Sequence, residues 1–287
     1  MSINLLPGAA PVFFSAPLVN RSADLAGQIV ATSMQALVHR VYQLDPTAYW
    51  LGSLGASDAT TEQIVMGLYS GSMQMPTSVD TIILLNHNLN NFLIEYCTNY
   101  APGVGGAAGT GTWQTLVSVT GQAGVDYVHI LASPIAAVNG LRISMYSTIP
   151  ANQQKQLGNF IAALSSFQMS VPPSKIKPSY RQRRVDVPMA DGSTDTGYYL
   201  WSDNSFTMTD HEIEIDFANV YSAQDKANFD ALFRQPSPFL FYPEPGDVPR
   251  NIFLSLFDPK SYTPGYSTQW KSGGRKIPFK THMVGYL

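Results

Sequence analysis

The stretch Asp80-Thr-Ile-Ile-Leu-Leu-Asn86-His87-Asn88-Leu89-Asn90 decides the fold. Its four consecutive apolar residues, 82–85, lie between an aspartate and an Asn-rich cluster, which predicts a strand covered on both faces. The cluster that follows is typical of a turn, because short polar side chains bond neighbouring backbone groups. We therefore expect a core strand that ends at this cluster, and a β-rich chain built around it.

The composition of the whole chain favours the same fold class. Aromatic residues make up 11% of its 287 residues, and 22 glycines and 20 prolines separate short apolar runs. This pattern is typical of many short strands joined by turns. The length allows two domains that each bury a core. We predict a mainly β protein with two domains.

Charge is the most unusual feature of the sequence. Charged residues are 13% of the chain, against about 25% in typical soluble domains. Residues 1–172 hold only eleven of them, whereas residues 173–287 hold twenty-six. A free soluble surface normally carries many charges of both signs. We interpret the first half as a surface that partners cover.

Several functional classes are disfavoured by composition. The formal net charge of −3 gives no broad attraction for nucleic acid or for an anionic membrane. A single cysteine, Cys97, excludes an intramolecular disulfide. The first basic residue is Arg21, so a signal peptide is not expected, and no apolar run reaches the length of a membrane span. We expect a soluble protein made in the cytoplasm, with no membrane insertion and no specific nucleic acid.

The remaining elements are predicted from periodicity. In His211–Phe217, apolar and acidic residues alternate strictly, which predicts a strand. The stretch 222–233 begins with a capping-box pattern and continues with an apolar face, which predicts one short helix. For residues 151–169 the pattern fits a strand or a helix, and the choice stays open. Further strands are predicted at 92–97, 113–119, 127–131, 141–146, 239–242, 251–257 and 280–286.

A domain boundary is predicted at Pro172-Pro173, where charge density changes and where a diproline cannot continue a helix or a central strand. The basic run Lys175–Arg184 follows it, and we interpret this run as a linker or a salt-bridged subunit contact. The expected domains are residues 1–172 and 173–287.

Two motifs suggest chemistry but lack its context. The stretch Gly103-Val-Gly-Gly-Ala-Ala108 fits a dinucleotide fingerprint, yet a β-branched run follows it where a helix is needed, so we interpret it as a hairpin loop. His87 has no second histidine at ligand spacing, and a turn histidine is the simpler interpretation.

The other candidate groups are scattered. His39, His129 and His282 lack a metal-site or hydrolase pattern, and the neighbours Asp210 and His211 would point to opposite faces of a strand. We therefore assign no catalytic, cofactor-binding or metal-binding residue, and we expect no cofactor and no enzymatic activity.

The first half also resembles a known family. The segments Ile82–Leu89, Trp113–Val119, Gly140–Met145 and Gln156–Phe160 resemble the discoidin-like, galactose-binding-like jelly roll found in virion proteins of tailed bacteriophages. The second half, with Glu212–Phe217, the helix at 222–233 and Pro238–Pro243, looks like the β modules of distal-tail and baseplate proteins.

This resemblance implies a structural role in a virion that is assembled in the host bacterial cytoplasm. The protein would form a homo-oligomeric ring around the tail axis, joining the tail tube to the baseplate or to receptor-binding proteins. A hexamer is implied only by analogy. The resemblance fixes neither the tail position nor the residues of any interface.

A second function stays open, that of a carbohydrate-binding module for attachment to host surface glycans. The two functions differ in what the fold exposes. A glycan binder should present Trp or Tyr beside amide side chains on solvent-facing loops, whereas an assembly protein should hide them between chains. The sequence offers two stretches for glycan contact, Asn86–Asn91 and Tyr96–Tyr100.

Overall fold

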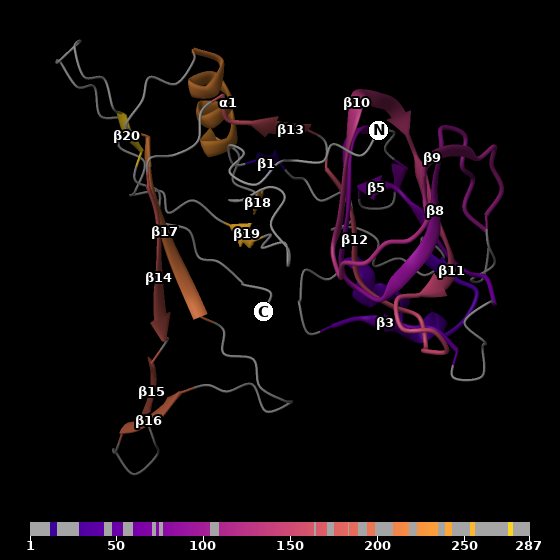
Figure 1. The fold of residues 1–287 in the computed structure, drawn as a ribbon, viewed down its shortest axis with the longest axis horizontal. Helices are drawn as coiled ribbons and strands as arrows, with labels where there is room; N and C mark the ends of the chain where they lie inside the picture. The colour runs from indigo at the N-terminus through magenta and orange to yellow at the C-terminus, as the bar shows by residue number, and fades with distance from the viewer. Residues whose placement is uncertain are drawn as a thin grey trace. The chain divides into compact units, whose positions relative to one another are not determined.

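A computed structural model describes the parts of the chain from which the fold is drawn (Figure 1). These are residues 12–15, 29–42, 48–53, 60–70, 73–74, 77–103, 109–163, 165–170, 175–182, 184–188, 194–198, 209–217, 223–234, 239–242, 253–255 and 275–277. The chain divides into two compact units, of which the first contains Phe14–Ser166 and the second Phe167–Leu287. The predicted boundary at Pro172-Pro173 lies outside the described residues and stays a prediction.

The chain is mainly β, as predicted. Its elements, in order, are β1 (Val12–Ser15), β2 (Ile29–Ala31), the 3-10 helix η1 (Gln35–Tyr42), β3 (Trp50–Leu51), β4 (Glu62–Gly67), β5 (Tyr69–Ser70), β6 (Met73–Gln74), β7 (Thr77–His87), β8 (Leu89–Cys97), β9 (Gln114–Val119), β10 (Tyr127–Val138), β11 (Gly140–Thr148), β12 (Gln156–Ala163), β13 (Ser165–Gln168), β14 (Lys175–Gln182), β15 (Arg184–Pro188), β16 (Thr194–Tyr198), β17 (Thr209–Phe217), α1 (Ala223–Arg234), β18 (Phe239–Tyr242), β19 (Phe253–Ser255) and β20 (Arg275–Ile277).

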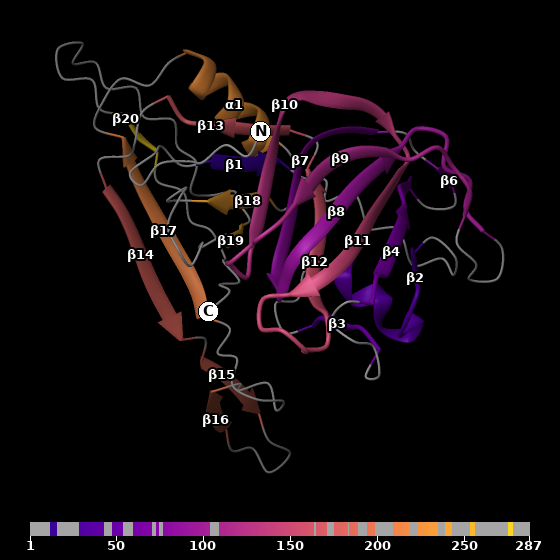
Figure 2. The same ribbon diagram turned by 45° about the vertical axis from the view of Figure 1, so that its right-hand side comes forward.

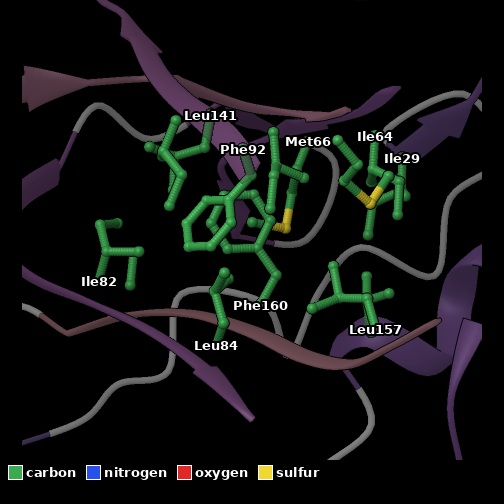
Figure 3. Close-up of a cluster of buried hydrophobic side chains, with 14 of the residues drawn as sticks. Ile29, Ile64, Met66, Ile82, Leu84, Phe92, Leu141, Leu157 and Phe160 are labelled. Atoms are coloured by element: carbon green, nitrogen blue, oxygen red, sulfur yellow. The ribbon is translucent and has the colours of Figure 1, made fainter. Parts of the chain in front are cut away.

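The first unit is a β-sandwich of two antiparallel sheets. One sheet has the order β10-β7-β12-β3 and the other the order β2-β4-β11-β8-β9. Figures 1 and 2 show the two layers. Their facing side chains form one apolar core, in which Leu84 and Phe160 come from the first sheet and Phe92 and Leu141 from the second (Figure 3). Burial of this apolar area is the main favourable contribution to folding of the unit.

Strand β7, which contains the stretch 82–85, is the central strand that the sequence predicts. It pairs antiparallel with β10 and with β12, so both of its edges are satisfied. Ile82, Ile83, Leu84 and Leu85 are all fully buried, although alternate side chains point to opposite faces. The prediction of a strand covered on both faces is therefore confirmed.

Within residues 151–169, for which the sequence left strand or helix open, the structured elements are the strands β12 and β13. Gly158 explains why the helical spacing does not decide the structure. A Cβ atom at this position would lie 2.7 Å from the carbonyl oxygen of Leu85, so only glycine lets β12 approach β7 this closely. Tertiary pairing thus overrides the local pattern.

The second unit is β-rich with one helix. Strand β17 and helix α1 match the predicted strand 211–217 and the predicted helix 222–233. The carboxylate of Asp225, in the first turn of α1, accepts hydrogen bonds from the backbone N–H and the hydroxyl of Ser170. The sheets that contain strands of this unit have the orders β13-β1-β18-β19, β14-β17-β20 and β15-β16. The predicted strand 280–286 lies outside the described residues.

The linker interpretation of Lys175–Arg184 is wrong. Residues Lys175–Gln182 form β14, which pairs with β17 along its whole length, and Arg184 begins β15. Pro178 is tolerated within this strand because β14 is an edge strand of its sheet. Lysine and proline are also common on edge strands because they discourage pairing with other chains.

Candidate binding site on the outer face of the five-stranded sheet

The register of β8 and β11 brings two opposite charges together. Arg142 of β11 lies directly opposite Glu95 of β8, and both side chains point away from the core. The Nε–H of Arg142 donates to Oε2 of Glu95 at 2.6 Å. Their side chains are 22% and 12% exposed, so solvent reaches this ion pair only in part. Partial shielding makes the contact stronger than an exposed surface pair.

An indole ring completes this arrangement. The guanidinium carbon of Arg142 lies 4.5 Å from the centroid of Trp113, in a cation–π contact. The ring of Tyr100 lies 5.6 Å from that of Trp113 and supports it from the buried side, because Tyr100 is only 2% exposed. Trp113 itself is half-buried. The site therefore presents an indole edge beside an ion pair.

The chain between β8 and β9 folds back over the outer face of the sheet to place these rings. A β-bridge joins Ala101 to Thr110 between the two strands. Residues 104–108 lie outside the described residues, so the hairpin loop at the Gly-rich stretch stays a prediction. Gly140 is required beneath it, since a Cβ atom there would lie 2.8 Å from Cβ of Tyr100. The dinucleotide interpretation of Gly103–Ala108 has no support, because strand β9 follows it.

Amide side chains lie beside the indole. Asn99 is exposed, and its Oδ1 accepts the backbone N–H of Thr112 at 2.9 Å. Gln114 is also exposed, and its Oε1 accepts the hydroxyl of Tyr96 at 2.7 Å. Asn99 thus contacts the residue before Trp113, whereas Gln114 reaches Tyr96, whose side chain packs on the core side of the sheet. An aromatic residue beside an exposed amide is part of the pattern expected of a glycan binder.

The Asn-rich cluster, in contrast, is structural. Asn88 donates to the carbonyl oxygen of Gln154 at 2.8 Å and accepts the N–H of Gln156 at 2.7 Å. Asn91 donates to the hydroxyl of Ser147 at 2.6 Å. These bonds tie the loops at one end of the sandwich together, so the amides of Asn86–Asn91 are used within the fold. Of the two stretches that the sequence offers, only 96–100 borders the site.

The described histidines of the first unit, His39, His87 and His129, do not form a common site. His87 is buried, and its Nδ1 accepts the N–H of Leu89 at 3.1 Å, which agrees with a structural role. His129 is buried on β10, where burial lowers its pKa, whereas His39 is exposed on η1. His282 lies outside the described residues. Among the described residues, no group of three or more His, Cys, Asp or Glu side chains could hold a metal ion.

Within the described parts of the chain, no helix is long and apolar enough to cross a membrane. Cys97 is a free cysteine, buried under the loop that carries Trp113.

Comparisons with known proteins give structural likenesses only. No protein-family model matches the chain, and no curated protein matches it. Among solved structures, chitosan-binding module 1 of a chitosanase/glucanase from Paenibacillus sp. IK-5 is 15% identical, with a TM-score of 0.37 over 50% of this chain and 98% of that one. Chitosan-binding module 2 of the same enzyme, in complex with chitotriose, is 16% identical, with a TM-score of 0.37 over 48% and 96%.

A family 32 carbohydrate-binding module of Clostridium perfringens NanJ, in complex with galactose, is 14% identical, with a TM-score of 0.37 over 47% of this chain and 91% of that one. At this level of similarity, none of these structures assigns a function to the chain.

Proposed function

We propose that the first unit is a non-catalytic carbohydrate-binding module that acts through the outer face of its five-stranded sheet. One observation carries the proposal: the half-buried indole of Trp113 lies beside the Arg142–Glu95 pair, with the exposed amide of Asn99 bonded to the preceding residue, Thr112. The site combines apolar ring surface with hydrogen-bonding groups of both kinds. Small-ligand sites are built from this mixture.

The chemistry of the site suits a sugar. The C–H groups of a pyranose ring can pack against apolar ring surface such as this indole edge, while its hydroxyls both donate and accept hydrogen bonds. The guanidinium of Arg142 has five N–H donors. Among the described residues, only its Nε–H has a hydrogen-bond acceptor, the carboxylate of Glu95. The terminal N–H groups of Arg142 and the carboxylate of Glu95 thus lie side by side. Adjacent hydroxyls of one sugar could form hydrogen bonds with both.

A glycan array with the full chain tests this function. Wild-type protein should bind at least one saccharide class, and Trp113→Ala should weaken that binding about tenfold or more, the effect of losing one good aromatic contact. Glu95→Gln keeps the shape of the site and should also weaken binding, which guards against a folding defect in the first variant.

A matched control is Tyr146→Ala. Tyr146 is an exposed aromatic residue on the same strand, four residues from Arg142 and so about 13 Å along β11. This variant should bind like the wild type. If Tyr146→Ala abolishes binding and Trp113→Ala does not, the site lies elsewhere. An array without any bound glycan would refute the proposal.

A second function, favoured by the charge distribution, is that of a structural subunit of a phage tail or baseplate, as the sequence resemblance implies. The charged residues among the described parts of the first unit are Arg40, Glu62, Asp80, Glu95, Asp126, Arg142 and Lys155, and all are buried or half-buried. A surface without exposed charge suits burial between subunits. Electron micrographs of purified protein that show rings, together with a negative glycan array, would favour this function over the first.

A further inference from the structure

Two sheet edges lie on the same side of the sandwich. Strand β9 ends the five-stranded sheet and β10 ends the four-stranded sheet. At the opposite ends of these sheets, β2 and β3 both contact η1, which closes that side. The edges formed by β9 and β10 therefore lie together on the other side, joined by residues 120–126 (Figure 2). We name β9, β10 and this connection the β9–β10 flank.

The flank has no exposed charge. Between Glu95 and Arg142 the sequence contains a single charged residue, Asp126. Asp126 is only 8% exposed, and its Oδ1 accepts the backbone N–H of Asn86 at 2.8 Å. An exposed flank normally carries mixed charges, so a face without any is unusual for a free surface.

The flank is also partly apolar. Five of its apolar residues pack against the core without being fully buried, and Val125 is 52% exposed. The five are Leu116, Val117, Val119, Leu131 and Ile135. Apolar surface that is only half covered by its own fold becomes favourable to bury when a partner arrives.

A partner can bind this flank more readily through side-chain contacts than by adding a strand to the edge of either sheet. The pairing of β9 with β8 shifts register between Ile94 and Glu95, and that of β10 with β7 shifts on both sides of Ile135. Pro134 of β10 cannot donate a backbone hydrogen bond. Bulges and proline on an edge disfavour pairing with a strand of another chain.

We propose that the β9–β10 flank binds the first unit of a second copy of this chain. A partner for an uncharged, half-apolar face must itself lack charge there, because a charge buried without a partner is costly. The described surface of the first unit meets that condition, whereas residues 173–287 carry twenty-six charges. The proposal does not depend on carbohydrate binding, which we assign to the outer face of the sheet.

Lysine substitutions on the flank test it. Ser118→Lys and Ala136→Lys place a charge at exposed positions of β9 and β10, where it should not disturb the fold. Thr61→Lys adds the same charge at an exposed position before β4, which β11 and β8 separate from β9. The full-length proteins would be compared by sedimentation velocity over micromolar concentrations, with circular dichroism melts to confirm folding.

We expect the wild type and Thr61→Lys to associate alike, and both flank variants to associate about tenfold more weakly or not at all. If the wild type precipitates, a higher soluble fraction of the flank variants alone supports the proposal. A wild type that stays monomeric, or association that both flank lysines leave unchanged, would overturn it. Saccharide binding, measured on the same samples, should be equal in the wild type, Ala136→Lys and Thr61→Lys, none of which changes the outer face near Trp113. Failure of the flank is thereby distinguished from failure of the glycan site.

Discussion

Gly140→Ala should damage both the fold and the candidate site. An added Cβ atom would lie 2.8 Å from Cβ and 2.9 Å from Cγ of Tyr100, and 3.3 Å from the ring of Trp113. Carbon atoms normally separate by about 3.5–4.0 Å, so Tyr100 must move by roughly 0.6–1.2 Å and push Trp113 with it. Overpacking of this kind costs about 1–3 kcal/mol, and the lower entropy of the unfolded Ala variant offsets about 0.4–1 kcal/mol.

The expected net loss of stability is therefore about 0–2.6 kcal/mol, with a midpoint near about 1.3 kcal/mol. Hydrogen exchange of β8 and β11 amides measures the first unit by itself, and at that midpoint exchange should accelerate about ninefold. Gly124→Ala is the control, because its Cβ atom would meet nothing closer than 3.5 Å. If Gly140→Ala exchanges as slowly as Gly124→Ala and binds saccharide normally, the packing of Tyr100 and Trp113 over Gly140 is wrong.

Two further predictions concern the core. Ile83→Asp or Leu85→Asp buries a carboxylate at a fully buried position and should abolish soluble first unit; a variant with the wild-type melting temperature would refute the central position of β7. Burial lowers the pKa of His129 below 6.5, so the stability that its neutral form contributes is present above pH 6.5 and is lost as the pH falls through the folded-state pKa. His129→Gln should flatten the dependence of the urea midpoint on pH between about 7.5 and 5, and an unchanged slope would exclude His129 as its source.

The elements were predictable where one local pattern dominates. The apolar run of β7, the strict alternation of β17 and the capping box of α1 each fix the type of element from neighbouring residues. Strand β12 could not be decided in this way, since its conformation depends on the close approach of Gly158 to β7. The basic run of β14 was misinterpreted because charge and proline suit a linker and an edge strand equally well.

The candidate site was only partly predictable. The sequence pointed to aromatic residues near 96–100, but it gave no reason to join Glu95 to Arg142, which are 47 residues apart. That contact depends on the register of β8 and β11, a non-local property. A usable signal was present: each residue is a rare charge on the polar side of an alternating strand, and opposite charges often pair across neighbouring strands.

The side-chain N–H signals of tryptophan test the proposed site most directly. The chain has four tryptophans, Trp50, Trp113, Trp201 and Trp270, whose indole N–H resonances can be assigned by single Trp→Phe substitutions. Trp50 is fully buried, and its Nε1–H donates to the carbonyl oxygen of Ser33, so it serves as an internal reference. On titration with the saccharide selected on the array, the Trp113 resonance should shift and saturate while that of Trp50 stays in place. A titration that shifts Trp201 or Trp270 and leaves Trp113 unchanged would contradict carbohydrate binding at this face.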